Sequence, residues 1–264
     1  MPHLVVFRDE GGTACPARES LDLTSMSPIT KGQIVAFGGG GFAMEPDNPL
    51  LDDYVLSLCG RPRPRVCLLP TAAGDSVAWI DRFYDVFTED RCEPTHLTLF
   101  SRSVDDLYGF LSEQDVLYVG GGNTVNLLAV WRAQGLADVL PRVLAEGVIA
   151  CGVSAGGLCW FERGITDSYG PMLTPLTNGL GFLPGSFCPH YDSDPRRPFA
   201  FGEFVRTTGQ PGLAAEDGVG LHYVDGRLER VVSSRPAARA WRLEPNGDDV
   251  RAEILQPDYL GATS

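Results

Sequence analysis

The chain has 264 residues, of which 44% are hydrophobic and 21% charged, a composition typical of a globular protein with a sizeable core. Its net charge of −13 and pI of about 4.7 argue against nucleic acids and membrane surfaces as partners, because both attract basic patches. The seven cysteines show no disulfide spacing pattern, which favours a reducing compartment. The first residues do not resemble a secretion signal, and no apolar run approaches the roughly 18 residues of a membrane span. We therefore expect a cytoplasmic protein.

The first two thirds of the chain predict an α/β fold. Residues 1–31 are expected to form a short N-terminal strand, Leu4–Phe7, and a polar surface arm. From residue 32 on, short apolar runs alternate with segments of helical periodicity, which indicates βαβ units and a mostly parallel sheet with helices on both faces. The predicted strands are 34–37, 66–69, 96–100, 116–119 and 148–153, and the predicted helices are 50–58, 76–87, 104–111, 125–133 and 136–146.

After about residue 180 the pattern changes to short strands joined by tight turns. Asp225-Gly226 and Asn246-Gly247 are strong hairpin signals between the predicted strands 221–224, 228–232, 240–243 and 250–254. We expect a catalytic core over residues 32–217 and an antiparallel C-terminal extension over 218–264, on the same sheet or packed beside it. The chain shows no linker or internal repeat, so a single domain over residues 1–264 is predicted. An exposed C-terminal edge strand is compatible with a homodimer.

The segment Val148–Phe161 carries the clearest chemical signal. A buried strand runs into Gly152-Val153-Ser154-Ala155-Gly156, a G-x-S-x-G turn, and then into a predicted apolar helix. Such a turn lifts a serine hydroxyl out of the sheet and places it at a helix N-terminus, where backbone N–H groups stabilise negative charge. The competing interpretation is a glycine-rich turn with an incidental serine.

A nucleophilic serine needs a base, and the base needs a carboxylate that orients it. Of the four histidines, His190 is placed best, because it follows an apolar segment at the expected ligand-binding edge of the sheet. An oxyanion site requires two N–H donors, for which the amide of Ala155 and the loop Gly120–Gly122 are suited. The residues leave the carboxylate open among Asp167, Asp192, Asp194, Glu216 and Asp217.

Four motifs resemble one known family. They are Y-V-G-G-G-N-T at 118–124, G-V-S-A-G-G at 152–157, C-P-H at 188–190 and A-E-D-G at 215–218. Together they are similar to the dipeptidase E and cyanophycinase family of serine peptidases, whose flavodoxin-like fold resembles the class I glutamine amidotransferases.

The resemblance implies roles for individual residues. Ser154 is the implied nucleophile and His190 the implied base, with the amides of Gly122 and Ala155 as oxyanion donors. The family's acid is usually a glutamate followed by glycine; here Asp217 stands at that position, and Glu216 is the alternative acid. The implied substrate-binding residues are Gly121, Asn123, Thr124, Arg196 and Arg197, the two arginines on a loop after the histidine.

The implied activity is that of a serine exopeptidase acting on short peptides, with dipeptides that begin with aspartate as the expected substrates. No cofactor is expected, and no metal, because Cys188-x-His190 is the only close Cys/His pair. One alternative is a hydrolase of another amide, isopeptide or ester on the same scaffold, as in cyanophycinase. The other is a non-catalytic nucleotide-binding relative, since Gly38–Ala43 fits G-x-G-x-x-A after a strand.

Overall fold

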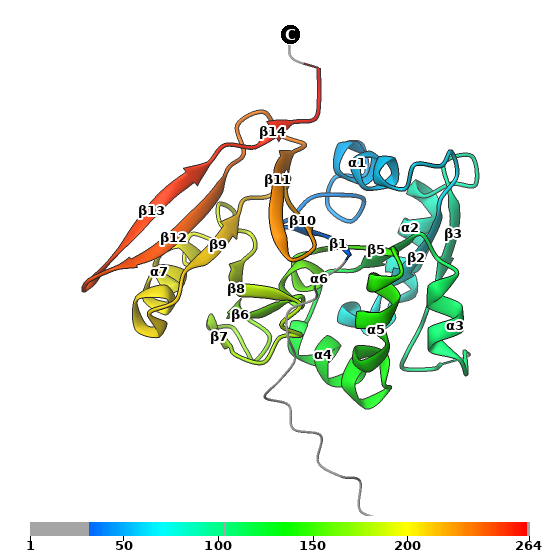
Figure 1. Cartoon of the computed structure of the whole chain (residues 1–264), viewed down its shortest axis with the longest axis horizontal. Coiled ribbons are helices and arrows are strands. Elements are labelled where there is room, and N and C mark those ends of the chain that lie inside the picture. The colour runs from blue at the N-terminus through cyan, green and yellow to red at the C-terminus, as the bar shows by residue number, and fades with distance from the viewer. Residues whose placement is uncertain (1–31, 103, 263–264) are drawn as a thin grey trace, which may run out of the picture.

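The computed structural model describes residues 32–102 and 104–262, so the predicted strand Leu4–Phe7 lies outside the described residues. The strands form two sheets (Figure 1). The larger has the order β14 (Asp258–Tyr259), β11 (Arg227–Ser233), β10 (Val219–Val224), β1 (Gln33–Phe37), β5 (Ile149–Val153), β4 (Val116–Val119), β2 (Arg65–Leu69) and β3 (Glu93–His96). The smaller has the order β13 (Asp249–Leu255), β12 (Ala240–Asn246), β9 (Gly212–Ala215), β8 (Leu183–Cys188), β6 (Phe161–Thr166) and β7 (Thr174–Leu176).

The larger sheet has the predicted α/β architecture. Its five strands from β1 to β3 are parallel, and β10 and β11 add to the β1 edge as an antiparallel hairpin. Successive strand side chains enter different cores; in β2, for example, Val66 and Leu68 face one side and Cys67 and Leu69 the other. Helices α1 (Leu50–Leu58) and α2 (Val77–Val86) cover one face, and α3 (Leu107–Ser112), α4 (Thr124–Ala133) and α5 (Leu136–Ala145) cover the other.

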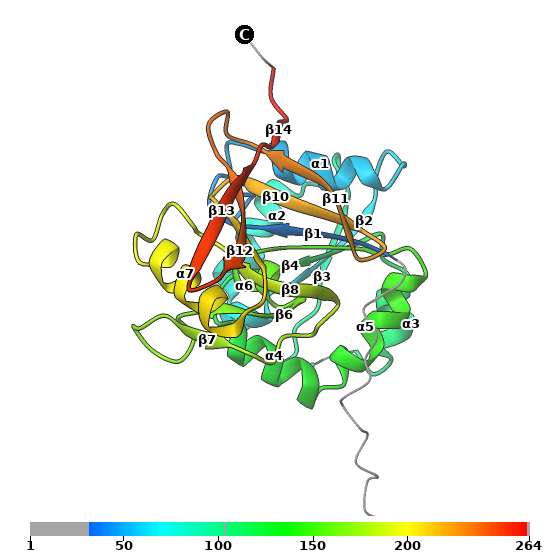
Figure 2. The ribbon, with the colours of Figure 1, turned by 60° about the vertical axis from the view of Figure 1, so that its left-hand side comes forward.

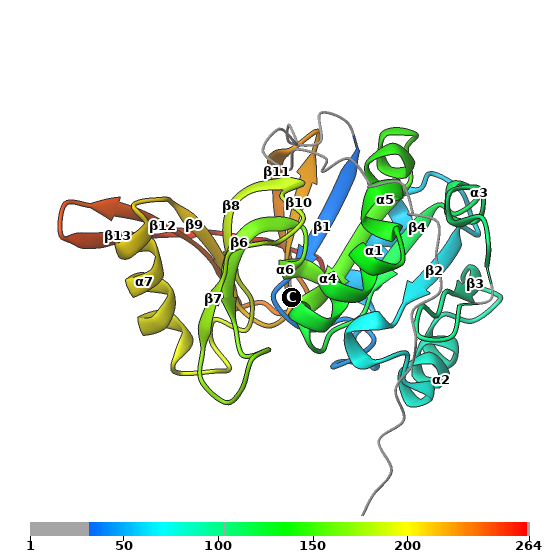
Figure 3. The ribbon, with the colours of Figure 1, turned by 90° about the horizontal axis from the view of Figure 1, so that it is seen from below.

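The smaller sheet packs against the larger one beside strands β1 and β10, as Figures 2 and 3 show from two directions. Phe161 of β6 stacks on Phe187 of β8 and meets the ring of Tyr223, which belongs to β10 of the larger sheet. Helix α7 (Arg197–Thr208) covers the opposite face, where Phe201 and Val205 join Cys188 of β8 in a separate core. Both faces of the smaller sheet are therefore covered at its central strands β8 and β9.

This second sheet corrects the sequence-based prediction in two places. The helix expected after Ser154 is only α6 (Ala155–Leu158), and β6 begins at Phe161 because Trp160 and Phe161 pack into the core that the two sheets share. The arginines expected on a loop start α7 instead, where Pro198 stands in the first turn and has a φ suited to that position. The C-terminal extension is divided, with the hairpin β10–β11 in the larger sheet and β12–β13 in the smaller one.

One predicted strand lies out of register with the structure. Strand β3 ends at His96, where the predicted strand 96–100 was to begin. The N–H groups of Leu99 and Phe100 instead donate to the carboxylate of Asp75, which holds this segment in a turn. In the described residues no helix is both long and apolar enough to cross a lipid bilayer.

A buried carboxyl group joins α1 to the centre of the larger sheet. Asp52 is 1% exposed, and its Oδ1 accepts a hydrogen bond of 3.0 Å from the hydroxyl of Tyr118 on β4. Its Oδ2 is buried and has no hydrogen-bond partner among the described residues. Burial raises the pKa of Asp52 to about 7, although the hydrogen bond from Tyr118 acts in the opposite direction.

We expect Asp52→Asn to stabilise the protein by about 2–4 kcal/mol above pH 7, because the carboxylate ionises at lower pH in the unfolded chain than in the folded one. The free energy of unfolding of the wild-type protein falls as pH rises from about 4 to 7, because ionisation of Asp52 is easier in the unfolded chain. An asparagine cannot ionise, so the variant does not lose stability in this way. The gain should therefore vanish near pH 4, grow up to pH 7 and stay constant above it. Urea unfolding across this pH range measures it. A gain independent of pH, or an equal gain from Asp81→Asn at an exposed site on α2, would contradict the explanation.

Candidate active site

Ser154 stands on a strained turn directly after β5. Its φ of 56° and ψ of −109° are unusual for a residue with a side chain, and its amide donates to the carbonyl of Phe37 over 3.1 Å. A Cβ atom on Gly152 would lie 2.4 Å from the carbonyl oxygen of Gly156, and one on Gly156 would lie 2.3 Å from that of Val119. The two motif glycines are therefore required by the close approach of α6 to β5 and β4.

His190 and Asp217 come from the smaller sheet, at the ends of β8 and β9, and their side chains are in contact. Nδ1 of His190 lies 2.6 Å from Oδ1 of Asp217. Burial alone raises the pKa of Asp217, but the hydrogen bond from His190 and the positive charges of His190 and Arg235 outweigh it, so this pKa lies below its ordinary value. An ionised Asp217 only accepts hydrogen bonds, so Nδ1 of His190 is the donor, and in the neutral ring Nε2 can act as a base.

The end of β1 brings the two sheets together at this point. Ser154 donates its amide hydrogen to the carbonyl of Phe37, and His190 donates its own to the next carbonyl, that of Gly38, over 3.1 Å. A Cβ atom on Gly39 would lie 2.0 Å from Oδ1 of Asp217 and 3.0 Å from Cε1 of His190, so only glycine fits there. Among the described residues, neither Oγ of Ser154 nor Nε2 of His190 makes a hydrogen bond, so the two atoms are not bonded to each other in this structure.

Of the two adjacent acids, the structure brings Asp217 rather than Glu216 to the imidazole. The carboxylate of Glu216 accepts from the backbone amide of Arg239 and from the indole N–H of Trp241, and so ties β9 to β12. Asp192, which follows His190 closely, accepts the backbone amide of Asp217 over 2.8 Å. This positioning contact was not predicted, and the only signal in the sequence is an aspartate in a turn-rich segment after a histidine.

The two expected oxyanion donors, the amides of Gly122 and Ala155, have no hydrogen-bond partner in the part of the chain that the structure describes. Ala155 is the first residue of α6, so its N–H precedes the helical hydrogen bonds. A Cβ atom on Gly121 would lie 3.4 Å from the carbonyl of Val153, which places the glycine loop beside the serine turn. Both free N–H groups therefore belong to segments that flank Ser154.

Asn123 makes structural contacts through its side chain, and Thr124 makes one through its backbone amide. Oδ1 of Asn123 accepts from the amide of Asn126 and caps α4, while its Nδ2 donates to the carbonyl of Ser168. Thr124 is buried, and its amide donates to the hydroxyl of Ser168. These contacts fix the glycine loop to the end of β6.

The two candidate arginines differ in their environment. Arg196 is exposed and makes two hydrogen bonds to the carboxylate of Asp194, of 2.8 and 2.9 Å, which lower the pKa of Asp194 to about 2. Arg196 also donates to the carbonyl of Pro171. The side chain of Arg197 is only 6% exposed and lies 3.8 Å from Asp194 and 4.0 Å from Asp167. Arg196 is thus the more accessible of the two.

The space beside the glycines that follow β1 is occupied by other segments of the protein. A Cβ atom on Gly38 would lie 2.4 Å from the carbonyl of Glu216, and Gly39 forms an isolated bridge with Asp217. The Gly38–Ala43 segment therefore holds the histidine and its acid, which leaves no room at Gly38 and Gly39 for a phosphate to approach the backbone as in a nucleotide site. The described residues contain no cluster of three or more His, Cys, Asp or Glu side chains suited to a metal ion.

A serine on a strained strand-to-helix turn, a histidine–carboxylate pair and two free backbone amides on an α/β scaffold are features of a serine hydrolase. Comparison with known families makes this class more specific. The model of peptidase family S51 matches residues 34–231, and the chain belongs to this family. It is a serine peptidase.

Individual relatives agree with the family. The chain is 48% identical over 230 residues to the "uncharacterized peptidase YgaJ" of Bacillus subtilis, a match that covers 87% of this chain and 99% of that protein. It is 30% identical over 141 residues to peptidase E of Streptomyces coelicolor, covering 50% and 57% of the two chains.

Two solved structures share the fold. A peptidase from an acI-B1 actinobacterium has a TM-score of 0.62 at 16% identity and covers 86% of this chain and 95% of its own. A putative peptidase E of Listeria monocytogenes has a TM-score of 0.52 at 16% identity and covers 86% and 100%. The predicted α/β fold and the predicted family are confirmed.

Proposed function

We propose that the protein is an exopeptidase that hydrolyses short peptides, chiefly dipeptides with N-terminal aspartate, with Ser154, His190 and Asp217 as its catalytic residues. The observation that carries this proposal is the 2.6 Å contact between His190 and Asp217. It orients the imidazole by engaging Nδ1 and leaves Nε2 without a partner, in a loop held on the same end of β1 as Ser154.

In the proposed acylation step, Oγ of Ser154 attacks the carbonyl carbon of the peptide bond while Nε2 of His190 takes the hydroxyl proton. The carbonyl oxygen becomes an oxyanion that accepts hydrogen bonds from the amides of Gly122 and Ala155. The C–N bond then breaks, and His190 returns its proton to the leaving amine. Asp217 stays ionised throughout and stabilises the imidazolium.

Deacylation repeats the same two steps, nucleophilic attack and release, with water as the nucleophile. His190 takes a proton from a water molecule as its oxygen attacks the acyl carbon. The bond between that carbon and Oγ of Ser154 breaks, and Oγ recovers the proton from His190. The products are a free amino acid from each end of the dipeptide and the original enzyme.

The preference for N-terminal aspartate rests on Arg196. A guanidinium group binds a carboxylate through two parallel hydrogen bonds, the geometry that Arg196 already adopts with Asp194. Arg196 is exposed at the start of α7, in the segment that follows His190, and a substrate carboxylate would replace Asp194 as its partner. Asp194, with a pKa of about 2, would keep the guanidinium in place when no substrate is bound.

A dipeptide panel tests this proposal. We expect Asp-Leu and other Asp-Xaa dipeptides to be hydrolysed with a kcat/KM at least about tenfold above that of Ala-Leu, the effect of one charge-assisted contact. Arg196→Gln should remove most of this preference by lowering kcat/KM for Asp-Leu without changing that for Ala-Leu. Arg206→Gln is the matched control, because Arg206 also pairs with an acid on α7, Glu203, but lies near the end of the helix.

The outcomes separate the alternatives. Turnover of Ala-Leu as fast as Asp-Leu would contradict the aspartate preference and leave a general dipeptidase. Turnover of β-aspartyl isopeptides or esters, with no dipeptide cleaved, would replace the peptide substrate by another acyl compound on the same site. A folded protein that cleaves none of these substrates would overturn the proposal.

A further inference from the structure

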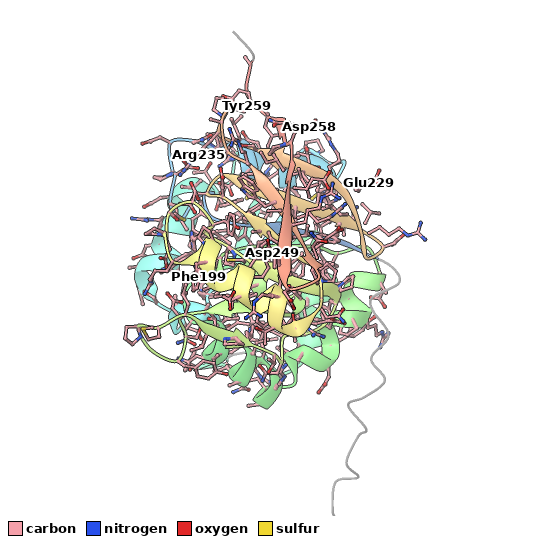
Figure 4. The ribbon with its side chains drawn as sticks, turned by 90° about the vertical axis from the view of Figure 1, so that its left-hand side faces the viewer. Phe199, Glu229, Arg235, Asp249, Asp258 and Tyr259 are labelled. Atoms are coloured by element: carbon pink, nitrogen blue, oxygen red, sulfur yellow. The ribbon has the colours of Figure 1, made fainter. Side chains whose placement is uncertain are left out.

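Strand β13 is a long and unprotected edge of the smaller sheet. It is seven residues long and pairs only with β12, and most of its residues are exposed. Figure 4 shows it on the outer face of the molecule, with Asp249 at its beginning and no other element over it. It contains neither lysine nor proline, which commonly protect edge strands from pairing with another chain, and its charges are of mixed sign, from Asp249, Arg251 and Glu253. The other sheet edges, β14, β3 and β7, have two to four residues each.

The hairpin geometry decides which backbone groups of β13 are free. Asn246 pairs with Asp249 across a two-residue turn, and the pair that closes such a turn exchanges hydrogen bonds. Hydrogen-bonded and non-bonded pairs then alternate along the hairpin. The position of Pro245 is consistent with this alternation, because proline has no N–H and Pro245 stands opposite Val250 in a non-bonded pair. The N–H and C=O groups of Val250, Ala252 and Ile254 therefore point away from β12.

We propose that β13 pairs with β13 of a second copy of this chain, antiparallel, about a two-fold axis at Ala252. In this register Ala252 faces Ala252, and Val250 of each copy faces Ile254 of the other. All three residues have outward backbone groups, so every facing pair among them exchanges hydrogen bonds. The dimer would join two six-stranded sheets into one continuous sheet.

Charge complementarity favours this register. Arg251 of each copy faces Glu253 of the other, so both polar pairs across the axis are of opposite charge. Within one copy Glu253 already stands opposite Arg242 of β12, and Arg251 opposite Glu244. The dimer therefore contains two rows of alternating charge, each running from Arg242 through Glu253 to Arg251 and Glu244 of the second copy.

The neighbouring registers are disfavoured. Sliding one strand by two residues in one direction places Glu253 opposite Glu253, and sliding it in the other places Arg251 opposite Arg251. Either shift loses two attractive pairs and introduces a like-charge contact on the axis, and each such change is worth about 0.2–1 kcal/mol.

The apolar side chains of β13 become less exposed to solvent in the same dimer. Ile254 stands opposite Trp241 of β12 and is 43% exposed, and Val250 stands opposite Pro245 and is only partly buried against the core on the side of α7. Pairing of Val250 with Ile254 from the second copy covers both side chains on this face. The polar and apolar faces of the strand therefore favour the same alignment.

Charge reversal tests this dimer with sedimentation velocity or light scattering over a concentration series. The wild-type chain should be dimeric at micromolar concentration. Arg251→Glu alone and Glu253→Arg alone should each weaken dimerisation at least about tenfold, because like charges then face each other across the axis. An equimolar mixture of the two variants should dimerise again, since in the mixed dimer every Glu faces an Arg.

Matched controls carry the same charge changes at exposed sites outside β13. Arg63→Glu and Glu89→Arg should leave the dimer unchanged. A wild-type chain that stays monomeric at high micromolar concentration would overturn the proposal. So would a dimer that survives both single variants, or a mixture that stays monomeric. Because the readout is mass and not hydrolysis, the result does not depend on the proposed substrate.

Discussion

Ser154→Ala is expected to lower kcat for peptide hydrolysis by about 10⁴-fold or more, because without the nucleophile only substrate binding and the two backbone amides remain. Stability should change by less than about 1 kcal/mol, since in the described structure the Ser154 hydroxyl has no hydrogen-bond partner to lose. Steady-state kinetics on Asp-Leu and thermal unfolding of both proteins measure the two effects.

Covalent labelling separates this interpretation from a structural one. A fluorophosphonate should add one label to the wild-type chain, located at Ser154 by mass spectrometry, and none to Ser154→Ala. Ser168→Ala is a control at a partly buried hydroxyl that bonds to Thr124 and Thr166, and this variant should still be labelled. If Ser154→Ala kept its activity, the proposed mechanism would be wrong.

The second large effect is expected at the acid. Asp217→Asn should lower kcat by about 10³- to 10⁴-fold, because an amide can donate a proton to Nδ1 of His190 and so favours the wrong tautomer of the ring. The neighbouring Glu216→Gln should lower kcat by less than tenfold and should instead reduce stability by about 1 kcal/mol. It weakens the contacts to Arg239 and Trp241 that tie β9 to β12.

These two variants are matched, since each replaces a carboxylate by its amide at adjacent positions. Comparing kcat with the free energy of unfolding for both therefore separates a catalytic role from a structural one. Equal losses of activity, or a larger loss in Glu216→Gln, would show that the contact between His190 and Asp217 does not carry the reaction.

Local sequence signals predicted the larger sheet well, because its strands are short continuous apolar runs and its helices are periodic. The helix Leu50–Leu58 and the strand Val116–Val119 match the structure residue for residue. In the smaller sheet the strands β12 and β13 were predicted, but β6 was missed because it follows the serine turn after a single helical turn. That segment, Ala155–Phe161, is apolar throughout, and an apolar run of this length is equally compatible with a helix or a strand.

The residues of the candidate site were easier to predict than the smaller sheet, which positions His190 and Asp217. The glycines around Ser154 and the histidine after an apolar strand are signals of backbone geometry and chemical type, which sequence displays directly. The choice between Glu216 and Asp217 depends on which way each side chain points at the end of β9. The partners that decide it, Trp241 and Gly39, are distant in sequence.

The division of the site between two sheets has a consequence for how activity arises during folding. Ser154 belongs to a segment complete by residue 158, whereas the base and its acid require β8, β9 and the β12 strand that pairs with β9. A nascent chain therefore carries its serine long before it has an imidazole to activate it. Under the proposed mechanism, proteolytic capacity would appear only when nearly the whole polypeptide has been made and its two sheets have docked.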